Sequence, residues 1–299
     1  LAYFFALAGM IGCLPAFQSN QLIQITGDLA FSEIENFNIL GGLVLAGITG
    51  LVVIGGLKRI AEVATFLVPL MGSIYFGAMI VALILNLNLV LPAFKLILVD
   101  AFNGTAIAGG TFFGVLIYGV RRGAFSNEAG MGTESLVHGV AKVSNPVKQG
   151  LVAMTGPIFD TLIICTATAL MILVSGVWET SSSQGVTLTA EAFSILLGNF
   201  GGLILFVCVI CFGLSTIFTY SYYGASCSRF LFGKFGMKFY IYLYILSIFI
   251  YSIVPIDIAI NIADGAFAMM AIPTLISALW LAPKVMQASK NYFKLIDNN

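Results

Sequence analysis

The sequence predicts an all-α membrane protein, and three observations carry this prediction. Of the 299 residues, 60% are hydrophobic and only 9% are charged, whereas soluble domains carry about 25% charged residues. The apolar residues form long continuous runs, which favour spanning helices over the short alternating segments of a barrel. A chain of this length has room for roughly eight spanning helices of about 20 residues each.

Hydrophobic runs separated by polar breaks define the eight predicted spans. They cover residues 2–25, 39–56, 63–86, 108–138, 151–176, 202–226, 239–255 and 257–282. Together they form a single predicted transmembrane domain over residues 1–299. The chain opens with LAYFFALAGMIGC, which lacks both an initiator Met and the basic start of a signal peptide. We therefore expect further spans upstream of an N-terminally truncated sequence.

The basic residues predict how these spans are oriented. Ten of the thirteen Lys and Arg residues follow the second, fourth, sixth and eighth spans, and the loops on the other side carry only Lys95. Because basic residues favour the cytoplasmic side, the even-numbered ends are predicted to be cytoplasmic. This pattern predicts a multi-pass protein of the plasma membrane, with an even number of upstream spans if the complete N-terminus is cytoplasmic.

The two remaining basic residues, Arg121 and Arg122, lie inside the fourth predicted span. They open the stretch RRGAFSNEAGMGTES, whose glycines and polar residues weaken a helix. Unwound backbone is tolerated in a bilayer only where it is buried in protein or lines a wet cavity. Two half-helices meeting there offer a positive end to a carboxylate and free carbonyls to an ammonium group. The sequence therefore predicts an interrupted helix suited to a zwitterion such as an amino acid.

Two acidic residues are candidates to pair with these arginines, and a third is a candidate gate. Glu128 lies in the same stretch, and such a pair would stitch helices together or act as a gate. Asp160 lies about ten residues into a span, where an unpaired carboxylate is costly, so we expect it to pair with Arg121 or Arg122. Asp264, in the last span, is a further candidate gate.

Several motifs occur in one order along the chain. GGLKRIAEV follows FQSNQ, and after RRGAFSNEAGMG come NPVKQGLVAM, FDTLIICTATALMIL, LSTIFTYSYYG and ADGAFAMMAIP. This order resembles the alanine/sodium symporter family over nearly the whole chain. The resemblance implies the five-plus-five inverted-repeat transporter fold of the amino acid–polyamine–organocation superfamily. The first span here would be the family's third, with two spans absent upstream, and the interrupted helix would be its sixth.

The resemblance also implies site residues. The expected substrate-binding set comprises Gly123, Phe125, Ser126, Asn127, Glu128, Gly130 and Gln18. Ser215 and Thr216 are expected to ligate sodium, which prefers oxygen donors, although such hydroxyls often bond to their own helix instead. Gln18 forms a polar cluster with Ser19 and Asn20, which would either line the pathway or bond between packed helices.

These features predict a secondary active symporter of a small neutral amino acid, driven by sodium. The expected partners are that amino acid, the sodium ion and membrane lipid, with no nucleic acid, no obligate protein partner and no cofactor beyond the coupling ion. Alanine and glycine both stay open, because Phe267-Ala268 replaces the family's Asn-Gly. A proton-coupled transporter and a truncated, non-transporting product remain alternatives, and the inner membrane of a prokaryote is the expected location.

Two other classes fit the sequence poorly. A membrane enzyme needs a nucleophile with a base, a carboxylate dyad or a metal cluster, and the chain has one His and five scattered Cys. A channel needs rings of carbonyls or charges around an axis. One interrupted helix in a long bundle fits a transporter better, so we expect no enzymatic activity.

Overall fold

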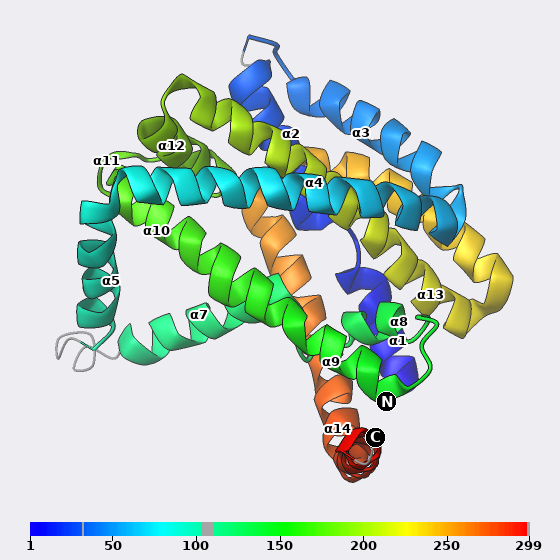
Figure 1. Cartoon of the computed structure of the whole chain (residues 1–299). Coiled ribbons are helices and arrows are strands. Elements are labelled where there is room, and N and C mark those ends of the chain that lie inside the picture. Colours follow the sequence, from blue (N-terminus) through cyan, green and yellow to red (C-terminus); the bar gives the residue numbers. More distant parts are fainter. Residues whose placement is uncertain (32, 103–110, 298–299) are drawn as a thin grey trace.

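The computed structural model describes residues 1–31, 33–102 and 111–297, and every regular element in these ranges is a helix (Figure 1). The helices are α1 (Ala2–Gly12), α2 (Ala16–Ala30), α3 (Phe37–Val53), α4 (Gly56–Leu85), α5 (Leu87–Ala101), α7 (Thr111–Asn127), α8 (Thr133–His138), α9 (Pro146–Pro157), the π-helix η1 (Ile158–Cys165), α10 (Thr166–Ser175), α11 (Val177–Thr180), α12 (Val186–Leu197), α13 (Asn199–Ile253) and α14 (Ile256–Asp297).

Five helical stretches of the described chain are long and apolar enough to cross a membrane. They are Ala2–Ala30, Gly56–Leu85, Pro146–Ser175, Phe200–Ile253 and Ile256–Ile296. Phe37–Val53 and Val186–Leu197 are apolar but shorter. The predicted all-helical membrane class is therefore confirmed, while the number of crossings and the inverted repeat stay predictions.

The predicted spans coincide with helices, with differences at particular places. The fourth predicted span starts at residue 108, and residues 108–110 lie outside the described ranges. The first span is divided into α1 and α2 at Cys13–Pro15, because Pro15 lacks the amide that a continuous helix would need. Three further helices, α5, α11 and α12, lie between predicted spans.

The longest helix, α13, contains two predicted spans that turn back on each other at Gly233. Gly233 has φ 68° and ψ −157°, which is not helical. The Tyr244 hydroxyl donates to the Ile217 carbonyl oxygen at 2.6 Å, although 27 residues of straight helix would separate them by about 40 Å. The chain therefore reverses at Gly233, between the predicted spans 202–226 and 239–255.

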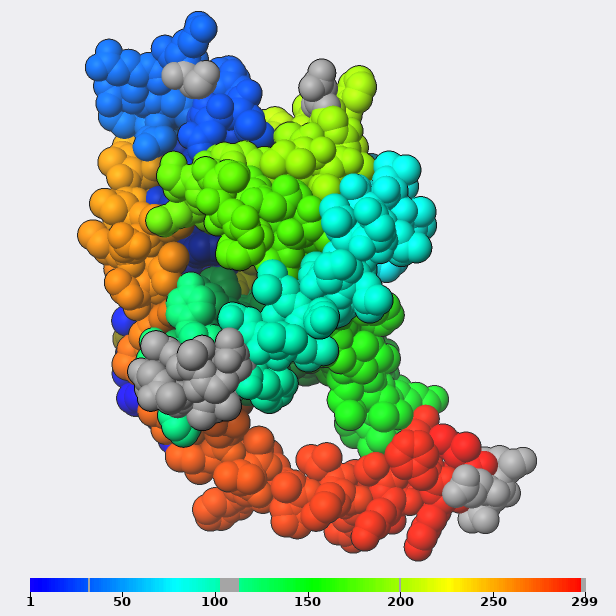
Figure 2. All heavy atoms as spheres, turned by 90° about the vertical axis from the view of Figure 1, so that its left-hand side faces the viewer, coloured from blue at the N-terminus to red at the C-terminus, as the bar shows by residue number. Residues whose placement is uncertain are grey.

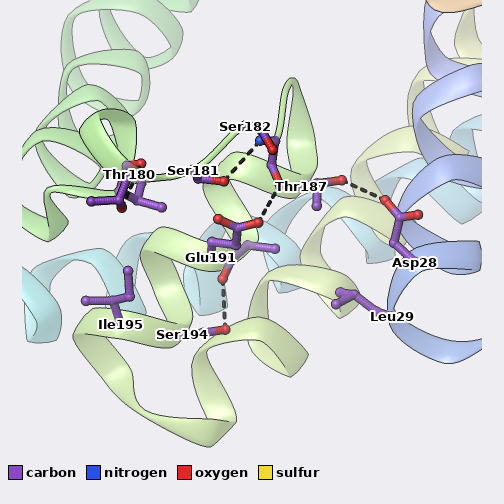
Figure 3. Close-up of a pocket in the computed structure, with 12 residues that line it drawn as sticks. Asp28, Leu29, Thr180, Ser181, Ser182, Thr187, Glu191, Ser194 and Ile195 are labelled. Carbon is purple, nitrogen blue, oxygen red and sulfur yellow. Dashed lines mark hydrogen bonds between the residues drawn. The ribbon is translucent and has the colours of Figure 1, made fainter. Parts of the chain in front are cut away.

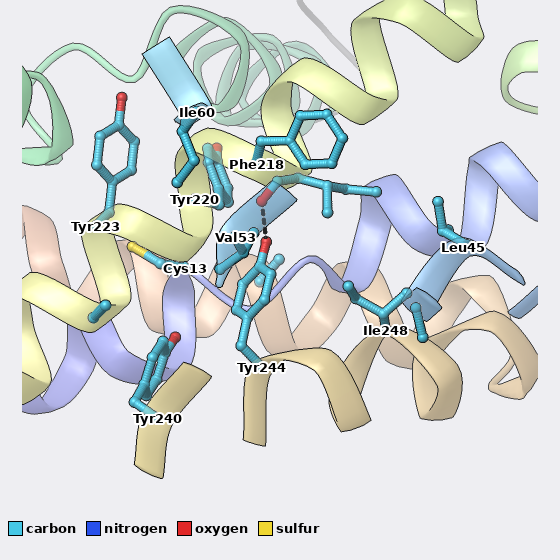
Figure 4. Packing of buried hydrophobic residues seen from close by; sticks show 14 of the residues in the cluster. Cys13, Leu45, Val53, Ile60, Phe218, Tyr220, Tyr223, Tyr240, Tyr244 and Ile248 are labelled. Carbon is cyan, nitrogen blue, oxygen red and sulfur yellow. Dashed lines mark hydrogen bonds between the residues drawn. The ribbon is translucent and has the colours of Figure 1, made fainter. Parts of the chain in front are cut away.

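The largest hydrophobic core lies where α13 packs against α1, α2, α3 and α4. Figure 4 shows its tyrosines, which bring polar groups into this apolar region. Tyr240 donates to the Met10 carbonyl oxygen at 2.8 Å, close to the break between α1 and α2. Because a buried hydroxyl needs a partner, this bond helps to position the reversed half of α13 on α1.

The last helix, α14, contacts α1, α2, α7 and α9. It contains Pro273 and Pro283, and prolines bend helices. Figure 1 shows the orange part of α14 from the side but its red end almost along the axis, and Figure 2 shows that red end at the lower edge of the molecule, beside the green segment. The first half of α14 is thus part of the bundle, and its last turns lie at the edge of the bundle.

Candidate functional site

The interrupted helix breaks at residues 128–132, between α7 and α8. Glu128, Gly130 and Gly132 have φ of 54°, 82° and 89°, in the left-handed region that glycine adopts at little cost. The break is shorter and later than predicted, because α7 stays helical from Arg121 to Asn127. A single Gly inside a helix costs about 1 kcal/mol relative to Ala, so Gly123 alone does not end α7.

The break packs directly on two other helices. A Cβ atom on Gly132 would lie 2.6 Å from Thr274 Oγ1 of α14 and 2.7 Å from Phe5 Cε2 of α1. Thr274 Oγ1 also lies 3.3 Å from the Met131 carbonyl oxygen. Gly132 is therefore required both by its backbone conformation and by the close approach of its neighbours.

Glu128 connects the break to α13. Thr133 donates its hydroxyl to Glu128 Oε2, and Tyr220 donates its hydroxyl to Glu128 Oε1. Thr133 is fully buried and Tyr220 is 4% exposed. The predicted pairing of an arginine with Glu128 is not what the structure shows, because two hydroxyls hold this carboxylate. Tyr220 was not predicted as a site residue, although a tyrosine in the middle of a span signals a hydroxyl that needs a partner.

Phe125 lies at the centre of an aromatic group. Its ring packs edge-on against Phe17 of α2 and Phe267 of α14, with both centroid distances 5.4 Å. Gln18, next to Phe17, is half-buried. The predicted substrate residues Phe125 and Gln18 thus come from segments that pack together. Phe267 of α14 packs against Phe125 as well.

Ser126 and Asn127 bond to the π-helix η1. Ser126 Oγ donates to Asp160 Oδ2 at 2.6 Å, and Asn127 Nδ2 donates to Thr161 Oγ1 at 3.0 Å. The Asn127 side-chain oxygen also accepts from the Ala129 amide at 2.9 Å. π-helical turns occur frequently at functional sites. The end of α7 is therefore tied to η1 on one side and, through Glu128, to α13 on the other.

Arg122 forms an ion pair with Asp264 of α14, 142 residues away in the sequence. Its guanidinium carbon also lies 5.3 Å from the Phe125 ring centroid and 5.6 Å from that of Tyr118. This partner differs from the expected one, since Asp160 accepts hydrogen bonds from Ser126 and Thr161 instead. Ser126 and Thr161 thus occupy Asp160, and Arg122 pairs with the carboxylate of α14.

Arg121 and Arg122 differ in environment although they are adjacent. Arg121 is exposed, whereas the Arg122 side chain retains 30% of its accessible surface and its Nε is buried without a hydrogen-bond partner among the described residues. Successive residues on a helix point about 100° apart. Only Arg122 therefore faces the bundle.

Ser215 and Thr216 lie on α13, one turn before Tyr220. Both hydroxyls donate to the Phe212 carbonyl oxygen, at 2.9 Å and 3.0 Å. This is the own-helix bonding that the sequence left open, and it leaves the oxygen lone pairs available to a cation. The predicted sodium ligands are thus on the same helix as the hydroxyl that holds Glu128.

Asn20 and Ser19 of the polar cluster in the first span lie in different environments. Asn20 Nδ2 donates to the Val254 carbonyl oxygen at 2.7 Å, which is interhelical bonding. Ser19 is fully buried, and its Oγ has no hydrogen-bond partner in the described part of the chain. The preceding α1–α2 break at Pro15 was not predicted, although a proline inside an apolar run is a recognised signal of one.

Two surface clefts lie away from these residues. Figure 3 shows the first, of about 670 Å³, where Asp28 of α2 faces Thr187 and Glu191 of α12. Thr187 Oγ1 donates to Asp28 Oδ2 at 2.9 Å. The second, of about 430 Å³, includes His138, whose Nδ1 lies 2.6 Å from Gln149 Nε2. Neither cleft is lined by the predicted substrate or sodium residues.

Comparison with known proteins relates the whole chain to transporters. The sodium:alanine symporter family profile matches residues 1–299. The sodium/alanine symporter AgcS of Methanococcus maripaludis is 34% identical over 293 residues, which cover 96% of this chain and 64% of that protein. The probable sodium/glutamine symporter GlnT of Bacillus subtilis is 33% identical over 275 residues, covering 91% of this chain and 58% of the relative.

A third relative, the uncharacterized transporter YflA of Bacillus subtilis, is 35% identical over 304 residues. The match covers 98% of this chain and 63% of YflA. The chain therefore spans less than two thirds of the length of these three relatives.

Proposed function

Because this chain belongs to the sodium:alanine symporter family, we propose that its full-length protein is a sodium-driven symporter of a small neutral amino acid, alanine or glycine. A family of transporters accounts for the helices of spanning length and for the polar motif among them. In this proposal the five-plus-five inverted-repeat fold and a plasma-membrane location come with the family. The protein is no enzyme, and the sodium gradient supplies the free energy through alternating access.

The observation that carries the proposal is the break at residues 128–132, together with the hydrogen bonds that join it and the end of α7 to α13 and η1. An amino acid bound there would offer its carboxylate to backbone amides and its ammonium group to free carbonyl oxygens at the end of α7. Phe125 and Gln18 would border the side-chain end of the substrate. In this proposal the packed rings of Phe125, Phe17 and Phe267 border the substrate and favour a small side chain.

The proposed coupling runs through α13. Ser215 and Thr216 would ligate sodium, and the hydroxyl of Tyr220 one turn later holds Glu128 at the break. Sodium binding would thus favour one position of α13, and Glu128 would carry that preference to the substrate. The ties of Ser126 and Asn127 to η1 would hold the opposite side of the break.

The decisive experiment is uptake of labelled alanine into proteoliposomes that contain the full-length protein. An inward sodium gradient should accelerate uptake, and unlabelled glycine should compete with alanine. Uptake that follows a proton gradient instead would support the proton-coupled alternative, since one relative is a sodium/proton-dependent alanine carrier protein of Bacillus sp. PS3. No uptake under any gradient, with folded protein in the vesicles, would contradict the proposal.

A further inference from the structure

The last helix continues beyond the predicted end of the final span at residue 282. α14 runs without interruption to Asp297, and Trp280, at the end of the span, is 80% exposed. Tryptophan is enriched where the hydrocarbon region meets the headgroups. The 15 residues from Pro283 to Asp297, which we call the terminal segment, therefore begin at the level of the membrane interface.

The terminal segment is amphipathic. At 100° per residue its basic side chains fall within an arc of about 120°, and its apolar ones within the opposite arc of about 180°. The apolar arc holds Val285, Met286, Ala288, Tyr292, Phe293, Leu295 and Ile296, with Ser289 among them, and Leu295 forms its edge next to Lys284. The basic arc holds Lys284, Lys290 and Lys294, with Gln287 and Asn291 between them. The segment thus has one face suited to hydrocarbon and one suited to anionic groups.

Both faces are open in the structure. Val285, Met286, Phe293 and Ile296 are exposed by 63%, 58%, 45% and 51%. The three lysines are exposed, and the ion pairs among the described residues do not include them. Figure 2 shows this red end of α14 at the lower edge of the molecule. An apolar arc that the bundle does not bury needs another apolar environment.

Charge indicates which environment that is. The excess of Lys and Arg after the even-numbered spans predicts that this end of α14 is cytoplasmic, where the leaflet carries anionic lipids. The bilayer that holds the first part of α14 also lies directly beside the terminal segment, because the two are one continuous helix. Basic amphipathic helices with exposed aromatic and aliphatic side chains bind in the plane of such an interface.

We propose that the terminal segment is an interfacial helix that binds the anionic headgroups of the cytoplasmic leaflet. Its apolar arc enters the boundary between headgroups and acyl chains, and Lys284, Lys290 and Lys294 contact lipid phosphates. The turn in α14 near its prolines allows the segment to leave the direction of the span. This inference does not depend on which substrate the protein carries.

Tryptophan quenching by brominated lipids tests the proposal on the full-length protein. Every tryptophan of the full-length protein, Trp178 and Trp280 included, is first replaced by Phe. A single reporter is then introduced as F293W on the apolar arc or as N291W, the matched control on the basic arc. In vesicles of phosphatidylglycerol brominated near the headgroup, quenching of the F293W reporter should exceed that of the N291W reporter at least about two-fold. Equal quenching of the two reporters would overturn the proposal.

Lipid charge supplies the second readout. Each lysine near an anionic surface changes binding about five-fold, so three lysines change the bound-to-free ratio on the order of 100-fold. Quenching of the F293W reporter should therefore fall in phosphatidylcholine vesicles and in the triple variant K284Q/K290Q/K294Q. The variant K142Q/K234Q/K238Q removes the same charge from other predicted cytoplasmic positions. In it the F293W reporter should be quenched as strongly as in the protein with all lysines present. If the F293W reporter is quenched equally in phosphatidylglycerol and phosphatidylcholine vesicles, the lysines do not bind anionic headgroups. This comparison does not depend on the lysine variants.

Discussion

Tyr220 on α13 donates its hydroxyl hydrogen to Oε1 of Glu128, across 92 residues of sequence. Glu128 has a φ of 54° and begins the break in the interrupted helix. A single carboxylate thereby joins the segment with the most unusual backbone of this region to the helix that bears the predicted sodium ligands. Hydrogen bonds to charged groups contribute about 1.5–3 kcal/mol each, which is enough to hold the break in one position.

Tyr220→Phe should lower sodium-driven alanine uptake about ten-fold and destabilise the protein by about 1.5–3 kcal/mol, because Glu128 loses one of its two hydroxyl donors. Uptake into proteoliposomes and thermal unfolding in detergent would measure the two effects. Tyr223→Phe is the matched control. Its ring lies 5.7 Å from that of Tyr220 on the same helix, and its hydroxyl has no hydrogen bond within the described ranges. Equal effects of the two variants would remove Tyr220 from the proposed coupling.

Glu128→Gln should abolish uptake while leaving membrane insertion intact. An amide has one acceptor oxygen where the carboxylate has two, so it cannot accept from Thr133 and Tyr220 in the same arrangement. Uptake per inserted molecule is the measurement, with Glu134→Gln as the control, because Glu134 lies in the neighbouring first turn of α8. Near-normal uptake by Glu128→Gln would exclude Glu128 from the proposed site.

Asp264→Asn should destabilise the protein by about 1–3 kcal/mol, between the values for exposed and buried ion pairs, because Arg122 then lacks its partner. Thermal unfolding measures this loss. The reversed pair R122D/D264R should recover part of it, whereas R122D with native Asp264 places two carboxylates together and should be the least stable. Asp257→Asn, at the exposed start of α14, should change stability little. If the reversed pair is no more stable than R122D, the ion pair does not contribute.

Gly132→Ala should destabilise the protein by about 1–3 kcal/mol, because alanine is strained at a φ of 89° and its methyl group would press on Thr274 and Phe5. Gly119→Ala in α7 is the control. A Cβ atom there meets nothing within 4 Å, and alanine favours a helix. Denaturation of both variants compares the two sites, and a Gly132→Ala protein as stable as Gly119→Ala would mean that the break can rearrange.

Ser215→Ala and Thr216→Ala should each raise the sodium concentration for half-maximal uptake, on the order of ten-fold, if their oxygens ligate the ion. Ser221→Ala is the matched control, because Ser221 also donates to a carbonyl of its own helix, that of Phe218, at 2.6 Å. Sodium titration of uptake separates the cases. If the titration curves match that of Ser221→Ala, Ser215 and Thr216 do not ligate sodium and only bond to a carbonyl oxygen of their own helix.

Local patterns predicted the elements of this fold well. Apolar runs predicted the helices, and the turn at Gly233 falls between two predicted spans. The polar stretch after Arg121 predicted an interruption, but it placed the start too early because Gly123 tolerates a helix. The α1–α2 break was missed since one proline was outweighed by the apolar residues around it. Each of these features depends on neighbours within a few turns, which is why sequence patterns report them.

The partners of the polar side chains depend on the tertiary structure. From the sequence, Asp160 was the expected partner of an arginine and Glu128 the alternative, while Asp264 was only a candidate gate, although all three are carboxylates in predicted membrane segments. The choice follows from how α7, α13 and α14 are rotated against one another, and that rotation minimises the free energy of the whole bundle. The sequence by itself therefore determined the membrane class, the family motif and the interrupted helix. The tertiary structure decided that Tyr220 holds Glu128 and that Asp264 pairs with Arg122, because side chains far apart in sequence meet only after the helices pack.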